Sequence, residues 1–132
     1  MREYFVDSFY WLAILNPDDA HRESILRWSG PPGRYVFADA IRFEVMDALS
    51  SRRLRVHALK FWDDTLASPI ATVVPVDGDL LARAVDLFRR RPDKDWSLTD
   101  CVSFVVMADR GIRTVLTGDR HFEQAGFEIA FK

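Results

Sequence analysis

The sequence has little cysteine, no long apolar run and no excess of charge of either sign, and each absence excludes a class of protein. Its single cysteine, Cys101, cannot form an intrachain disulfide or a cysteine-rich zinc site, which fits a reducing cytoplasm. No stretch approaches the roughly 20 apolar residues that a membrane helix needs, and no signal peptide is visible. The 18 basic and 20 acidic residues give a formal charge of -2, which excludes a polybasic nucleic-acid-binding tail. We therefore expect a cytoplasmic protein without a membrane segment.

What is present is enough apolar material for a compact core. The chain has 132 residues, of which 48% are hydrophobic and 13% aromatic. A chain of this length and composition fits one globular domain, and neither an internal repeat nor a linker interrupts it. We expect residues 1–132 to form that single domain.

Short apolar segments alternate with helix-length ones along the chain. We expect strands at 3–6, 35–38, 72–76, 114–117 and 127–131, and helices at 8–15, 16–28, 39–53, 57–67, 79–90 and 97–110. Helix-length connections between short strands imply right-handed crossovers and a mainly parallel sheet covered on both faces. The predicted fold is a three-layer α/β/α sandwich, in which ligands bind at the carboxyl ends of the strands.

Two aspartates directly follow predicted strands. Asp7 closes the apolar strand at 3–6, and Asp119 comes just past the strand at 114–117. Because the carboxyl ends of parallel strands lie at one edge of a sheet, these two side chains are expected to converge there. The alternative for each is an ordinary helix cap, since aspartate is favoured at that position.

A glutamate lies within the helix predicted at 39–53. Glu44 is at the edge of an apolar stripe, three residues after Ile41 and four before Ala48, and is expected to face inward. The alternative is a glutamate that extends to solvent or pairs with Arg42 or Arg53.

A fourth acid begins the helix predicted at 97–110. Ser97 and Asp100 have the spacing of a capping box, so a capping role is one interpretation of Asp100. The helix is apolar on nearly every side, however, which indicates that it is buried. Four carboxylates in such places are costly to bury and repel one another, so a shared site would require a divalent cation.

Four segments, in this order, resemble the PIN domain family along almost the whole chain. They are Phe5-Val6-Asp7-Ser8, Glu44 in the helix after the second strand, Ser97-Leu98-Thr99-Asp100, and Leu116-Thr117-Gly118-Asp119-Arg120-His121-Phe122 with Ala125-Gly126-Phe127. The family often has threonine or serine where this chain has Val36-Phe37-Ala38, a departure that leaves all four acids in place.

The resemblance implies a metal-dependent endoribonuclease of the VapC-like toxin kind, which hydrolyses RNA phosphodiester bonds. It implies that Asp7, Glu44, Asp100 and Asp119 are both the catalytic residues and the ligands of one or two Mg²⁺ or Mn²⁺ ions. Thr99 and Thr117 are expected to hold a carboxylate or a substrate phosphate by hydrogen bonds. His121, beside Phe122, is interpreted as structural rather than catalytic.

The implied partners are an RNA substrate, a cognate antitoxin protein and a second copy of the chain. A homodimer is expected because the helix at 8–15 carries more apolar surface than one small core uses. The alternatives are a PIN nuclease that is not a toxin, and a non-catalytic PIN-like module that binds RNA or a partner. A phospho-acceptor signalling domain fits poorly, because that class needs an acidic pair after the first strand and an aspartate after a middle strand, for which Val74-Pro75-Val76-Asp77 is only a weak candidate.

Overall fold

The computed structural model describes residues 1–131, and its centre is a sheet of parallel strands in the order β3-β2-β1-β4-β5. The strands are β1 (Arg2–Val6), β2 (Gly33–Ala38), β3 (Ala71–Val74), β4 (Thr114–Leu116) and β5 (Glu128–Ile129). Phe5 and Val6, which point to opposite faces of β1, are both fully buried. The sheet is therefore covered on both faces, as its apolar strands predict.

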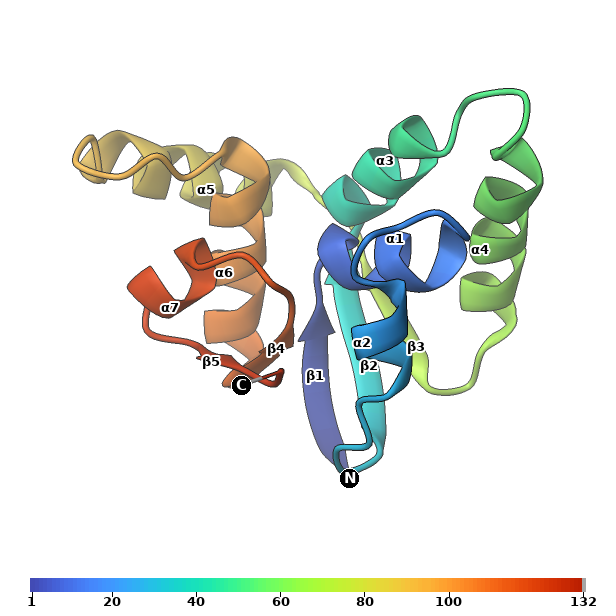
Figure 1. Cartoon of the computed structure of the whole chain (residues 1–132). Helices are drawn as coiled ribbons and strands as arrows, with labels where there is room; N and C mark the ends of the chain where they lie inside the picture. The colour runs from blue at the N-terminus through green and yellow to red at the C-terminus, as the bar shows by residue number, and fades with distance from the viewer. Residues whose placement is uncertain (132) are drawn as a thin grey trace.

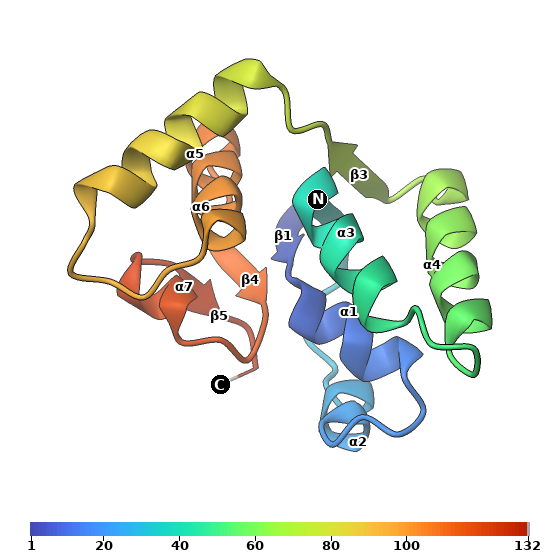
Figure 2. The same cartoon turned by 90° about the horizontal axis from the view of Figure 1, so that it is seen from above.

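Helices cover the two faces in two groups. They are α1 (Ser8–Leu15), α2 (Arg22–Leu26), α3 (Asp39–Ala48), α4 (Arg55–Ala67), α5 (Gly78–Arg90), α6 (Leu98–Arg110) and α7 (His121–Gln124). Figures 1 and 2 show α1 to α4 gathered on one side of the molecule and α5 to α7 on the other. Right-handed crossovers produce this division, because the chain moves from β1 to β3 in one direction and from β3 to β5 in the other. The predicted three-layer α/β/α fold is confirmed.

Successive strands are added in opposite directions on the two sides of β1, which gives the sheet a switch point between β1 and β4. The first connections lead from β1 through β2 to β3, and the later ones lead to β4 on the opposite side of β1. In open parallel sheets the crevice at the carboxyl ends of the strands on either side of such a point is where ligands bind. Asp7 follows β1 and Asp119 follows β4, so the two aspartates flank this crevice.

Some predicted boundaries were wrong, and local hydrogen bonds explain why. The helix expected at 16–28 is reduced to α2, because Asn16 and Asp19 accept hydrogen bonds from the backbone two residues on and form turns. The helix expected at 39–53 ends at Ala48, before a serine-containing turn. The strand expected at 72–76 stops at Val74, since Pro75 has no backbone N–H to donate.

The apolar surface expected on the first helix is used inside the chain. Trp11 and Ala13 are buried, and Tyr10, Leu12 and Leu15 pack against the core. Among the helices and strands, the most exposed large apolar side chain lies on α3 instead, where Phe43 is 71% exposed. The apolar surface of α1 therefore gives no support for a homodimer, which stays a prediction. No helix in the described part of the chain is long and apolar enough to cross a membrane.

Candidate metal-binding active site

The pairing of β1 with β4 places Asp7 beside Thr117. Phe5 is opposite Val115 and Val6 opposite Leu116, so the next pair along the two strands is Asp7 and Thr117. The Thr117 hydroxyl donates a hydrogen bond of 2.7 Å to Oδ2 of Asp7, and both residues are buried. Thr117, predicted to hold a carboxylate or a phosphate, thus contacts a carboxylate of the predicted quartet.

Burial controls the charge of Asp7. The pKa of Asp7 is raised from 3.8 to about 7, chiefly by desolvation and to a smaller extent by the nearby charges of Glu44 and Asp100. Hydrogen bonds from Thr117 and from the Ser8 backbone act in the opposite direction. Asp7 has the backbone conformation of a helix N-cap, but its side chain makes no capping hydrogen bond. The capping interpretation of this side chain is therefore wrong.

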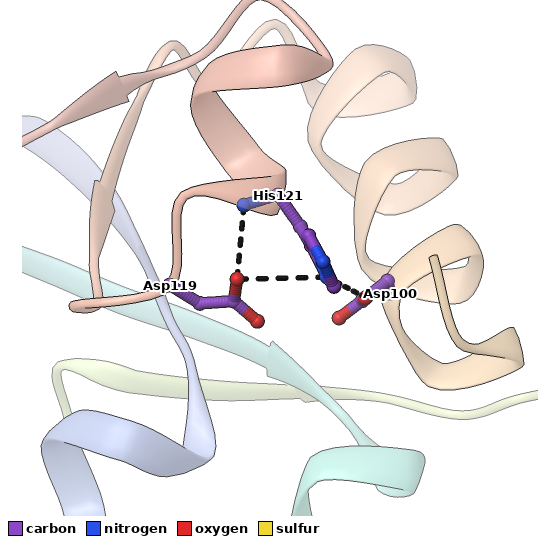
Figure 3. A group of neighbouring side chains, drawn as sticks. All are labelled: Asp100, Asp119 and His121. Carbon is purple, nitrogen blue, oxygen red and sulfur yellow. Dashed lines mark hydrogen bonds and ion pairs between the residues drawn. The ribbon is translucent and has the colours of Figure 1, made fainter. Parts of the chain in front are cut away.

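Asp100 caps α6 and also faces the site. Its carboxylate accepts a hydrogen bond of 3.0 Å from the Ser97 backbone N–H, and the Asp100 N–H donates one to the Ser97 hydroxyl. The same Oδ2 lies 2.8 Å from Nδ1 of His121. The predicted capping box is thus confirmed, and it holds the carboxylate at the end of α6 nearest to α7 (Figure 3).

Asp119 is held by the loop between β4 and α7. Its backbone N–H donates to the Thr117 hydroxyl oxygen at 3.0 Å, and its Oδ1 accepts from the His121 N–H at 2.9 Å. A Cβ on Gly118 would lie 2.5 Å from the Phe9 ring, so a glycine lets this loop approach α1. One chain of hydrogen bonds therefore connects Asp7, Thr117, Asp119 and His121.

Glu44 reaches the same cluster from α3. Its carboxylate accepts a hydrogen bond from the Ser8 side chain and lies close enough to Asp100 and Asp119 to feel their charges. The residue is exposed, so the expectation that it faces the core is wrong, although partial burial of its carboxylate is the largest cause of its raised pKa. The alternative pairings are also wrong, since Arg42 bonds to Asp39 and Arg53 to Asp18.

The four predicted acids are thus near enough to interact through their charges, although among the described residues only Asp100 and Asp119, together with His121, offer donor atoms within 4.8 Å of one another. Asp7 interacts with the charges of Glu44 and Asp100, and Glu44 interacts with those of Asp100 and Asp119. Within residues 1–131, no lysine or arginine forms an ion pair with any of the four. Carboxylate oxygens are the donors that Mg²⁺ and Mn²⁺ prefer, so the donor set and its excess negative charge fit a hard divalent cation.

Two predictions about neighbouring residues had different outcomes. Thr99 is half-buried and lines a hollow of about 240 Å³ between α3, α5 and α6, together with Phe43 and Leu98. Its role in binding substrate stays a prediction. His121, interpreted as structural, has its ring beside the Asp100 and Asp119 carboxylates (Figure 3). The spacing Asp119-Arg120-His121 indicated that both residues belong to one tight turn, but it did not determine the direction of the ring.

A comparison with protein families decides the identity of this arrangement. The model of the PIN domain family matches residues 4–128, which include all four acids. The chain belongs to the PIN domain family. The predicted family is therefore confirmed, and the cluster at the carboxyl ends of β1 and β4 lies within the matched residues.

This PIN domain is similar to characterised proteins along nearly its whole length. It is 29% identical over 124 residues to the 23S rRNA-specific endonuclease VapC20 of Mycobacterium tuberculosis, covering 93% of this chain and 94% of the relative. The crystal structure of VapC20, described as a sarcin-ricin loop cleaving toxin, matches with a TM-score of 0.84 and 27% identity over 94% of this chain and 95% of that one. FitAcB from Neisseria gonorrhoeae matches in fold, with a TM-score of 0.68 and 15% identity over 96% and 95% of the two chains.

Proposed function

We propose that this PIN domain is a metal-dependent endoribonuclease that hydrolyses RNA phosphodiester bonds and acts as the toxin of a type II toxin–antitoxin pair. The observation that carries the proposal is the convergence of Asp7, Glu44, Asp100 and Asp119 at the switch point, without a lysine or arginine paired to them in residues 1–131. The similarity to VapC20, a 23S rRNA-specific endonuclease, supports RNA as the substrate.

The four carboxylates would hold one or two Mg²⁺ or Mn²⁺ ions. When bound, the ion supplies a water of lowered pKa and charge that stabilises the phosphate undergoing displacement. Thr117 fixes the rotamer of Asp7 through its 2.7 Å hydrogen bond, and the capping box fixes Asp100. Both carboxylates are therefore oriented before substrate binds, which reduces the reorganisation that the reaction requires.

An antitoxin partner and a cytoplasmic location form part of the same proposal. The apolar side chains that face solvent on α3 and α4 support a protein partner: Phe43 is 71% exposed, Leu59 59% and Leu66 61%. Surfaces of this kind on a small domain are typical of protein–protein contacts.

Cleavage of a defined RNA tests the proposal. We expect the purified protein to cut an oligonucleotide that carries the sarcin–ricin loop sequence when Mn²⁺ or Mg²⁺ is present, and EDTA to stop it. Asp7→Asn, Glu44→Gln, Asp100→Asn and Asp119→Asn should each lower the rate by about 100-fold or more, because each removes a charge from the shared site. Asp109→Asn, a change at an arginine-paired aspartate on α6, should leave the rate unchanged.

The controls separate loss of chemistry from loss of fold. Circular dichroism should show that every variant remains folded, and a scrambled RNA of equal length shows whether the loop is recognised. Cleavage that survives all four substitutions would exclude these acids from catalysis. Absence of cleavage with every RNA and ion would favour a non-catalytic PIN-like binding module.

A further inference from the structure

His121 lies two residues after Asp119, and its ring faces the site in an orientation that neither helix capping nor core packing explains. Nδ1 of His121 lies 2.8 Å from Oδ2 of Asp100 and 3.5 Å from Oδ1 of Asp119. One donor atom from each of these three residues lies within 4.8 Å of the others. Figure 3 shows the ring, from the start of α7, directed at the two carboxylates.

These distances suit a shared coordination sphere. Donor atoms at adjacent corners of an octahedron with bonds of about 2.1 Å lie about 3 Å apart. The two distances from Nδ1 to carboxylate oxygens, 2.8 and 3.5 Å, lie on either side of that value. Since all three donors lie within 4.8 Å of one another, a shift of the two carboxylates toward the ring would place them around one ion.

The backbone around the ring is fixed independently of any ion. The His121 N–H donates to Asp119, and the next residue, Phe122, is fully buried against Phe5 and Phe104. The ring itself is 30% exposed, so a cation can approach it from solvent. A side chain that served only to fill space would not need to face two carboxylates.

We propose that Nδ1 of His121 is a direct metal ligand of this site, together with Asp100 and Asp119, and that it makes the site selective for Mn²⁺ over Mg²⁺. The inference rests on the proposed function and adds a nitrogen donor to its carboxylate set. Mg²⁺ is hard, keeps its waters and prefers oxygen, whereas Mn²⁺, the first ion of the transition series in which affinity for nitrogen donors rises, accepts imidazole more readily than Mg²⁺ does. Mixed oxygen and nitrogen ligation should therefore favour Mn²⁺.

His121→Asn tests this selectivity, because the asparagine amide offers an oxygen near the position of Nδ1. We expect calorimetric titration of the wild-type protein to give tighter binding of Mn²⁺ than of Mg²⁺. In His121→Asn, Mn²⁺ affinity should fall by at least about tenfold, while Mg²⁺ affinity changes less. The matched control is His57→Asn on α4, which should keep the wild-type ratio of the two affinities.

Pulsed electron paramagnetic resonance of the Mn²⁺-loaded wild-type protein tests the bond without any variant. A coordinated imidazole gives ¹⁴N modulation, which changes to the ¹⁵N pattern when histidine is labelled with ¹⁵N. Absence of nitrogen coupling, or an unchanged affinity ratio in folded His121→Asn, would overturn the proposal and leave His121 as an ion-pair partner of Asp100. RNA cleavage without nitrogen coupling would overturn this inference alone, whereas absence of both metal binding and cleavage would remove the proposed function as well.

Discussion

Two groups of acidic residues in this molecule have opposite electrostatic surroundings. Arg83 on α5 donates to Asp109 on α6, and in the turn after α5 Arg91 donates to Asp93. The hydrogen bond from the arginine is the largest cause of the lowered pKa of each of these two acids. At the switch point, Asp7 and Glu44 have raised pKa values, chiefly because of desolvation.

The fold pairs the first group of acids with arginines, whereas the acids at the switch point repel one another. An exposed carboxylate beside an arginine needs nothing more, and such surface pairs contribute little to stability. A buried carboxylate beside other carboxylates costs free energy in the metal-free protein. Of the two groups, only the acids at the switch point carry this cost, and a cation that binds there removes it.

The pH dependence of stability should show the largest contrast between the two groups. The folded-state pKa of Asp7 is about 7 against 3.8 when solvated, so the folded protein binds the proton more tightly than the unfolded chain does. Stability of the metal-free protein should therefore fall as pH rises from about 4 to about 7, by up to about 4 kcal/mol from this group. Asp7→Asn, which mimics the protonated form, should remove most of that fall.

Urea unfolding in EDTA at pH 5 and pH 8 measures this effect. At pH 8 the Asp7→Asn protein should be more stable than the wild type. Asp109→Asn should change stability with the opposite sign and only slightly, because Arg83 stabilises the charged form of that exposed residue. An Asp7→Asn protein that is less stable than the wild type at pH 8 would show that Asp7 is not destabilising when ionised.

The sequence predicted the elements of this site better than it predicted their limits. The strands before Asp7 and Asp119 are runs of apolar residues between polar ones, so their carboxyl ends were predictable from pattern alone. The start of α2 depends on asparagine and aspartate side chains that hydrogen-bond to nearby backbone, and α3 ends in a turn in which the Ser50 N–H donates to the Asp47 carbonyl. Such local competition is not visible in hydrophobic periodicity.

Convergence of the acids was predictable, whereas their exposure was not. Asp100 was expected to be both cap and site residue, and the structure gives it both contacts. Glu44 was expected to be inward because it borders an apolar stripe, but the residue is exposed and its carboxylate interacts with the Ser8 side chain. The role of His121 depends on which way a short turn directs a ring, and a single sequence does not determine that direction.

Metal binding should distinguish the two groups of acids by a smaller difference in stability than pH does. A ligand present at 100 times its dissociation constant stabilises a fold by about 2.7 kcal/mol. We expect Mn²⁺ at that excess to raise the melting temperature of the wild type by roughly 5–10 °C. Asp7→Asn and Asp100→Asn should abolish the rise, because each lowers the negative charge that attracts the ion. Asp109→Asn, whose charge is already paired, should retain it. A wild-type protein without any shift in millimolar Mn²⁺ would contradict a shared site.

Removal of a single hydroxyl should have the smallest effect. The Thr117 hydroxyl stabilises the ionised form of Asp7 and also accepts the Asp119 N–H, so it couples two of the acids. Thr117→Val should raise the pKa of Asp7 and move the pH at which stability levels off upward by about 1 pH unit, since a hydrogen bond to a charged group contributes about 1.5–3 kcal/mol. Thr114→Val, at the other end of β4, is the matched control and should leave the pKa of Asp7 unchanged. Carboxylate ¹³C chemical shifts of Asp7 followed through a pH titration measure the pKa directly. An unaltered titration of Asp7 in Thr117→Val would mean that burial and neighbouring charges alone determine its protonation.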